Sequence, residues 1–170
     1  MADAPKTPTA PAGGAPTAVE AAGLAPITVR AQYLKDLSFE NPGAPQSLMQ
    51  MTQAPNVQIN VNVEAKKLSD KDYEVTLHIR GEAKQAENVL FLVELAYAGI
   101  FFLENLAENL IQPVLLIEAP RLLFPFARTI VAEATREGGF PPLLIQPVDF
   151  VALYQQHMAQ TRATAPGGTA

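Results

Sequence analysis

The chain has 170 residues, which is enough for one domain with a hydrophobic core. It contains no cysteine and only two histidines, so disulfides and thiol chemistry are excluded and a zinc site is disfavoured. Seventeen acidic residues outnumber twelve basic ones, giving a net charge of -5 at pH 7. Because binding to nucleic acid depends on contacts between Lys or Arg and phosphate, this balance argues against a nucleic-acid partner and favours a basic protein partner.

The two ends of the chain differ in composition from its middle. Residues 1–26 are rich in Ala, Pro, Gly and Thr, and residues 161–170 are similar. Such segments cannot offset the entropy lost on ordering, so both are predicted to be disordered, with residues 27–160 as the folded domain. The longest apolar run, Val89–Leu103, contains Glu94 and falls short of the roughly 20 apolar residues that a membrane span needs. Residues 1–26 also lack the apolar core of a signal peptide, so we expect a cytoplasmic protein without stable membrane insertion.

Four segments have the pattern of β-strands. Apolar residues alternate with polar ones over residues 27–39, 57–64 and 73–80, which is typical of strands with one buried face. The alternation slips at Leu34, which predicts a β-bulge, and the short polar connection between the second and third strands predicts a hairpin. Residues 88–100 are apolar on both faces apart from one carboxylate, which is typical of a strand covered on both sides by its own domain or by another subunit.

Helical patterns follow the strands. A short helix is predicted at residues 106–111, and a long one from Pro120, a residue that suits a first turn, to the Gly138-Gly139 pair that ends it. A proline-rich apolar loop over residues 140–147 then leads to a last helix at about residues 148–157. Four apolar residues at helical spacing are expected in the core or in a subunit interface: Phe124, Phe126, Ile130 and Val131. Strands followed by helices predict an α+β fold, with the long helix packed on one face of a four-stranded antiparallel sheet and a second helix at the C-terminus.

Several short blocks occur in a fixed order: Tyr33-Leu34-Lys35-Asp36-Leu37-Ser38-Phe39-Glu40, then Phe91-Leu92-Val93-Glu94, then Leu122-Leu123-Phe124-Pro125-Phe126-Ala127-Arg128 and Gly138-Gly139-Phe140-Pro141-Pro142-Leu143. In this order and spacing they resemble the SecB family of bacterial preprotein-export chaperones over residues 27–160. The resemblance implies a homotetramer, a dimer of dimers in which each dimer forms one eight-stranded sheet and the long helices lie between the two sheets. It also implies a holdase that keeps secretory precursor proteins unfolded without ATP, metal or cofactor, and delivers them to the translocation ATPase SecA.

Four residues match the positions through which the family docks SecA: Asp36, Glu40, Leu92 and Glu94. Glu94 interrupts an apolar strand, and because a buried unpaired carboxylate is costly, it is expected to point to water or to a basic partner. Without the resemblance, the three carboxylates would be interpreted as an ordinary solvated face. Residues on the other face of the same strand match positions that support tetramer assembly: Val93, Leu95 and Tyr97.

Two apolar segments are candidates for contact with unfolded clients. The first lies between two prolines and contributes Leu48, Met49 and Met51. The second is the loop between the two helices and contributes Phe140, Leu143, Leu144 and Ile145. Methionine adapts its shape to varied partners, and prolines hold a segment extended, which lowers the entropy lost on binding. Packing beneath a long loop is the alternative for the first segment, and packing into the core is the alternative for part of the second.

The sequence gives less support to other functions. The chain has no glycine-rich phosphate loop, nucleophile elbow or cluster of metal-binding residues, so no catalytic activity is expected. A chaperone dedicated to a toxin–antitoxin pair would share the fold but lose the SecA-docking carboxylates, and their presence here favours export. A carrier of a small apolar ligand would need an enclosed pocket with convergent polar groups, for which the sequence offers no candidate set.

Overall fold

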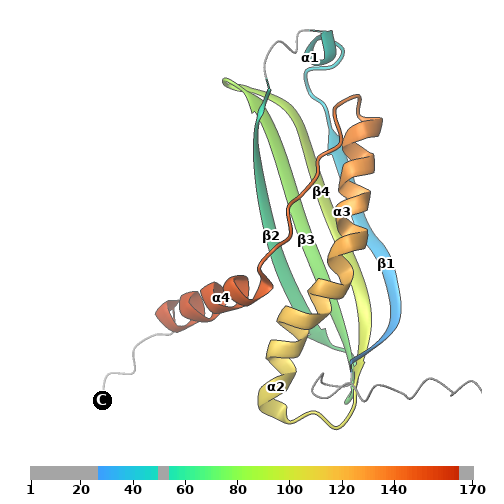
Figure 1. Cartoon of the computed structure of the whole chain (residues 1–170), viewed down its shortest axis with the longest axis vertical. Coiled ribbons are helices and arrows are strands. Elements are labelled where there is room, and N and C mark those ends of the chain that lie inside the picture. Colours follow the sequence, from blue (N-terminus) through green and yellow to red (C-terminus); the bar gives the residue numbers. More distant parts are fainter. Residues whose placement is uncertain (1–26, 50–53, 165–170) are drawn as a thin grey trace, which may run out of the picture.

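The computed structural model describes residues 27–49 and 54–164 of the chain. Four strands form one antiparallel sheet in the order β1-β4-β3-β2: β1 (Ile27–Glu40), β2 (Asn56–Lys67), β3 (Asp72–Gln85) and β4 (Asn88–Leu103) (Figure 1). The short helix α1 (Gln46–Met49) lies in the connection from β1 to β2, and the helical elements after β4 are α2 (Glu108–Pro113), η1 (Val114–Glu118), α3 (Ala119–Glu137) and α4 (Phe150–Thr164). This architecture confirms the predicted fold class.

The strand pairing follows the polar–apolar alternation. β2 and β3 pair without a break from Asn56 opposite Lys84 to Lys67 opposite Tyr73, which confirms the predicted hairpin. β1 and β4 pair with a shift of register just after Leu34, which confirms the predicted bulge. A second shift occurs earlier on β1, near Val29.

The two helices predicted after the last strand form one continuous helical rod. α2, η1 and α3 follow one another without an intervening loop, so the predicted short helix at residues 106–111 is the start of the same rod. The rod contains a π turn, η1, between Pro113 and Pro120. Because proline cannot donate a backbone N–H, a locally wider turn lets the helix continue past a residue that would otherwise interrupt it.

The hydrophobic core lies between α3 and one face of the sheet. Its fully buried members include Val75, Leu77, Val93 and Phe101 from the sheet and Leu123, Ala127 and Val131 from α3. The opposite face of the sheet, which we call the open face, carries no described helix (Figure 1). Within the protomer, β4 is therefore covered by α3 on one side, and cover of its other side by another subunit stays a prediction. On the open face of β4, Ala96 and Ala98 are small, and they are buried between the longer side chains of the neighbouring strands β1 and β3.

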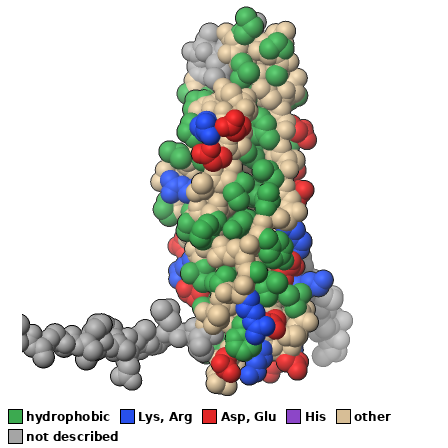
Figure 2. All heavy atoms as spheres, turned by 90° about the vertical axis from the view of Figure 1, so that its right-hand side faces the viewer, with side chains coloured by type: hydrophobic (Ala, Val, Ile, Leu, Met, Phe, Trp, Pro, Cys, Tyr) green, Lys and Arg blue, Asp and Glu red, His purple; other side chains and the backbone are tan. Residues whose placement is uncertain are grey.

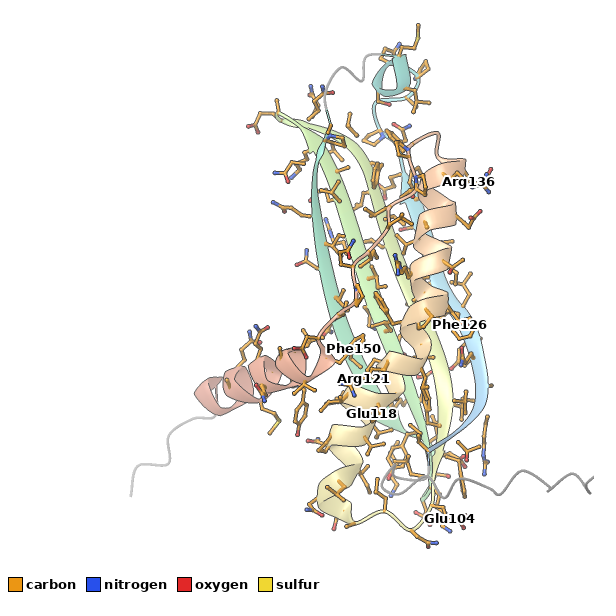
Figure 3. All side chains as sticks on the ribbon, in the orientation of Figure 1. Glu104, Glu118, Arg121, Phe126, Arg136 and Phe150 are labelled. Atoms are coloured by element: carbon orange, nitrogen blue, oxygen red, sulfur yellow. The ribbon has the colours of Figure 1, made fainter. Side chains whose placement is uncertain are left out.

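An extended segment, residues 141–149, runs from the end of α3 back along the sheet to α4 (Figure 1). The Asp149 carboxylate caps α4 by accepting the backbone N–H groups of Val151 and Ala152, at 3.0 Å each. Phe150 is buried where the segment reaches α4, with its ring 6.0 Å from that of Phe124 on α3 (Figure 3). α4 continues to Thr164, past the boundary predicted at residue 160. The predicted N-terminal tail, and the C-terminal tail from residue 165 onward, lie outside the described residues.

Candidate docking and client-binding surfaces

The register of the sheet places the four predicted docking residues on the open face. Glu40 on β1 lies opposite Leu92 on β4, and Leu92 in turn lies opposite Glu82 on β3. Glu94 follows two positions along β4, and Asp36 lies opposite the next residue on that face of β4, Ala96. Because side chains alternate between the two faces of a strand, these residues all project to the same side. The leucine therefore sits between two carboxylates that are far apart in the sequence.

Glu94 is exposed, but it has a counterion. Its carboxylate oxygen Oε1 accepts a hydrogen bond from Nη1 of Arg80, its direct cross-strand partner, at 2.9 Å. The side chains of Glu94 and Arg80 are 45% and 50% exposed, so solvent screens the pair and its contribution to stability is small. Sequence reasoning missed Arg80, because only the register of β3 against β4 reveals that it lies beside Glu94.

Among the carboxylates on and around the docking residues, the negative charge that no Lys or Arg compensates lies on β1. On β2, Glu64 has only Nε2 of His78 nearby in the described part of the chain, at 3.5 Å. Glu74, Glu82 and Glu94 each pair with a Lys or Arg within 3.0 Å. Among the described residues, Asp36 and Glu40 form no ion pair.

A second polar cluster lies on the open face beyond the docking residues. Tyr33 on β1 reaches over Ala98 on β4 and donates its hydroxyl to Oε1 of Glu74 on β3, and the ammonium of Lys35 contacts the same carboxylate at 3.0 Å. The hydrogen bond from Tyr33 and then the one from Lys35 hold the pKa of Glu74 below its usual value. The same bond to Glu74, together with burial and the nearby negative charge, raises the pKa of Tyr33 to about 12.

The residues predicted to support assembly lie on the covered face of β4. Val93 and Leu95 are buried in the core beneath α3. Tyr97 is also buried; its ring stacks against that of Phe126 at a centroid distance of 6.3 Å, and its hydroxyl donates to Oε1 of Gln32 at 3.3 Å. In the protomer these residues position α3 and β1, and their role in assembly remains a prediction.

Beside this buried set lies an exposed strip of large apolar residues, which we call the α3–β1 strip. α3 contributes Leu122 and Phe126, and the helix-covered face of β1 contributes Val29, Leu34 and Leu37. Figure 2 views the molecule from this side and shows hydrophobic side chains spread along its length, and Figure 3 locates Phe126 on α3 facing β1. Phe124 and Val131 are buried as expected, whereas Phe126 is 52% exposed and belongs to this surface.

The fold brings the two predicted client-binding segments to the same end of the molecule. Leu48 on α1 packs over Gly139 at the end of α3, so closely that a Cβ at Gly139 would lie 3.1 Å from Leu48 Cδ2. Gly139 also has a φ of 87°, which other residues rarely adopt. Beside α1, a hollow of about 620 Å³ separates the Pro42–Ser47 side from the turn between β3 and β4. Met51 lies outside the described residues.

Exposure divides the predicted client-binding residues into two groups. Phe140 and Ile145 are buried in the protomer, as the alternative of packing into the core expects, and their contact with clients stays a prediction. The ring of Phe140 packs against Phe91 at 4.9 Å and near Phe39, because the chain turns inward directly after the two glycines. The exposed members are Leu48, Met49 and Leu144, with Met49 82% and Leu144 59% exposed, and Leu143 is half-buried.

Thr135 fixes the extended segment against α3. It is fully buried, and its hydroxyl oxygen accepts the backbone N–H of Leu143 at 2.9 Å while donating to backbone oxygens one turn earlier in α3. This anchor was not predicted; its only sequence signal is a hydroxyl residue on the otherwise apolar face of the helix.

Across residues 27–49 and 54–164, no group of three or more His, Asp or Glu side chains is placed to hold a metal ion. None of the helices there combines the length and hydropathy of a membrane span.

Comparison with known proteins agrees with this architecture. The family model described as preprotein translocase subunit SecB matches residues 20–161. The chain belongs to the SecB family. The protein-export protein SecB of Bradyrhizobium diazoefficiens is 53% identical over 154 residues, covering 91% of this chain and 94% of the relative. The protein of the same name from Maricaulis maris is 48% identical over 168 residues, covering 98% and 92%.

A solved structure shares the SecB fold. It is a SecB-like chaperone of Mycobacterium tuberculosis in complex with a peptide from an antitoxin, with a TM-score of 0.61 and 13% sequence identity. The match covers 72% of this chain and 90% of the other. At this identity the likeness concerns the fold alone.

Proposed function

We propose that this SecB-family chain is an ATP-independent holdase that keeps secretory precursors unfolded in the cytoplasm and delivers them to SecA. The observation that carries the proposal is the similarity, at about half identity and over nearly the whole chain, to proteins named for protein export. The function needs no chemistry on the chaperone, only surfaces for a client, for SecA and for other copies of the chain.

The client surface is proposed at the end of the molecule where α1 meets the end of α3. Leu48 and Met49 present exposed apolar side chains there, and Leu144 continues an apolar path along the extended segment. Unfolded chains expose apolar stretches of varied sequence, which suit a surface built from flexible side chains. Several such surfaces on one oligomer would hold a client by avidity without tight individual contacts.

The SecA surface is proposed on the open face around Leu92. Its support is geometric: the two adjacent strands β1 and β4 bring Asp36, Glu40 and Glu94 to one side of the sheet with Leu92 among them. The two carboxylates without an internal counterion would attract a basic partner and speed its encounter.

The oligomer is proposed to be a tetramer assembled as a dimer of dimers. β1 is an edge strand of the sheet, so its outer backbone groups are available to extend the sheet into a second copy. The α3–β1 strip would then be covered between the two dimers, which accounts for large apolar side chains left on the surface of the protomer. On this proposal Tyr97→Ala weakens the assembly, because the buried ring of Tyr97 stacks against Phe126 of the strip and holds it in place. Tetramers of this variant that persist at low concentration would contradict the proposal.

Native mass spectrometry of the purified protein, alone and with a precursor that is either folded or chemically unfolded, tests the function directly. The expected result is a tetramer that takes up only the unfolded precursor. A monomer indifferent to unfolded chains would overturn the proposal.

The alternatives gain little from the structure. The antitoxin peptide belongs to a protein that shares only the fold with this chain. For a carrier of apolar ligands, the hollow between α4, η1 and β2 is small, with a volume of about 190 Å³. Ligand pockets usually measure about 300–1,000 Å³. Two larger hollows, of about 340 Å³ on the open face over Ala96 and of about 620 Å³ beside α1, are lined mainly by polar residues.

A further inference from the structure

The chain carries its sulfur only in methionine. It has four methionines and neither cysteine nor tryptophan. In a protein without thiols, the solvent-accessible thioethers are the side chains most open to a two-electron oxidant such as a peroxide. Two of the four methionines lie in the described part of the chain: Met49 on α1, which is 82% exposed, and Met158 on α4, which is half-buried. Of these two, Met49 is therefore the one that an oxidant reaches first.

The exposure of Met49 follows from how its neighbours hold α1, at one end of the molecule (Figure 1). Leu48 packs over Gly139, where an added Cβ would lie 3.1 Å from Leu48 Cδ2. One residue earlier, the hydroxyl of Ser47 donates a hydrogen bond to Oδ1 of Asn41 at 2.8 Å. These two contacts fix the short helix against the rest of the protomer, and the side chain of Met49 is left in solvent. The thioether is thus presented on the proposed client surface, next to Leu48.

We propose that Met49 is a modification site at which peroxide reversibly weakens the capture of unfolded precursors. The inference rests on the proposed holdase function and adds a regulation of its client surface. Hydrogen peroxide transfers one oxygen atom to the sulfur of Met49; the thioether is oxidised by two electrons to the sulfoxide, and the peroxide is reduced to water. A methionine sulfoxide reductase reverses the step. Two thiols of the reducing system then supply two electrons and two protons and become a disulfide, and the oxygen leaves as water.

The sulfoxide changes the client surface from apolar to polar at its most exposed point. A thioether is apolar and flexible, and it adapts to client side chains of varied shape. A sulfoxide is polar, and its oxygen needs a hydrogen-bond donor when it leaves water. The apolar side chains of a captured segment offer no such donor. Oxidation of Met49 should therefore weaken capture about tenfold, because each contact would bury an unpaired oxygen.

The test uses the full-length protein treated with hydrogen peroxide, which catalase removes before the client is added. Peptide mass spectrometry follows the sulfoxide at each methionine, and Met49 should be oxidised about threefold faster than Met158, or more, since it is the more exposed. Fluorescence anisotropy then measures the dissociation constant for a labelled, chemically unfolded precursor. That constant should rise about tenfold after oxidation and return to its starting value after treatment with methionine sulfoxide reductase and a thiol. Native mass spectrometry verifies that oxidised and untreated protein assemble alike.

Substitutions separate residue 49 from the other methionines. Met49→Leu keeps an apolar side chain of similar size that peroxide does not oxidise, so its capture of precursor should be unaffected by peroxide. Met51→Leu and Met158→Leu are the matched controls, and both should lose capture on oxidation as the wild type does. Met49→Gln introduces an unbranched polar side chain and should weaken capture without any oxidant.

Three results would overturn the inference while the holdase proposal stands. They are equal rates of oxidation at Met49 and Met158, an oxidised wild type that captures precursor as tightly as before, and a Met49→Leu variant that loses capture on oxidation as much as the wild type. An untreated wild type that fails to capture unfolded precursor refutes the proposed function itself, and this inference with it.

Discussion

Replacement of Phe126 by serine tests whether the α3–β1 strip is covered in the tetramer. A phenylalanine side chain can bury roughly 200 Å², and at 52% exposure about 100 Å² of it remains open in the protomer. At about 25 cal/mol per Å², covering that area contributes about 2.5 kcal/mol for each copy, or about 10 kcal/mol for four copies as an upper estimate. If only a quarter of this is realised, Phe126→Ser should still raise the dissociation constant of tetramer into dimers about fifty-fold or more.

The assay is sedimentation velocity or native mass spectrometry over a dilution series, with circular dichroism to verify that the protomer remains folded. Leu144→Ser is a matched control: Leu144 is 59% exposed but lies on the extended segment, away from the strip. It should leave the tetramer unchanged and weaken the capture of unfolded precursor. A Phe126→Ser tetramer as stable as the wild type, or equal dissociation of both variants, would refute the reasoning.

Three further substitutions give predictions of known direction. Glu94→Lys should weaken SecA binding with the tetramer intact, because it reverses an exposed charge and sets two cations side by side; unchanged affinity in a titration would remove Glu94 from the docking surface. Gly138→Ala should destabilise the protomer by about 1–3 kcal/mol in urea unfolding, because its Cβ would lie 2.2 Å from Cζ of the Phe39 ring, and an unchanged midpoint would show that the ring can move aside without cost. Tyr33→Phe should cost about 1 kcal/mol at neutral pH. The pKa of Glu74 is lowered in the folded state, so its ionised carboxylate stabilises the fold at pH values above its ordinary pKa, and this stabilisation is lost as the pH falls through the folded-state pKa. The difference in stability between Tyr33→Phe and wild type should therefore shrink in acid. A difference that does not depend on pH would contradict this.

The local elements were largely predictable because they depend on near neighbours in the sequence. The alternation in residues 57–64 and 73–80 predicted the hairpin, and the slip at Leu34 predicted the bulge. The continuity of the helix between residues 111 and 120 was not predictable in the same way. Proline usually ends a helix, and a π turn lets this helix continue.

Within the candidate site, the sequence placed Glu94 correctly on an exposed face but gave no sign of Arg80, fourteen residues earlier. It also grouped Phe140 and Ile145 with Leu144 as one apolar loop. The structure buries Phe140, because the chain turns inward directly after the two glycines. It buries Ile145 and exposes Leu144, because these adjacent residues of the extended segment point to opposite sides.

The sequence by itself determined the SecB family, the α+β class and the residue types available for docking, since these depend on composition, periodicity and the order of short motifs. Only the tertiary structure decided which side chains meet. The pairing of Glu94 with Arg80, the placement of Leu92 between Glu40 and Glu82, and the hollow over Ala96 all require the register of three strands. Register is set by long-range packing of one sheet face against α3, and a shift of one residue would move every one of these side chains to the other face.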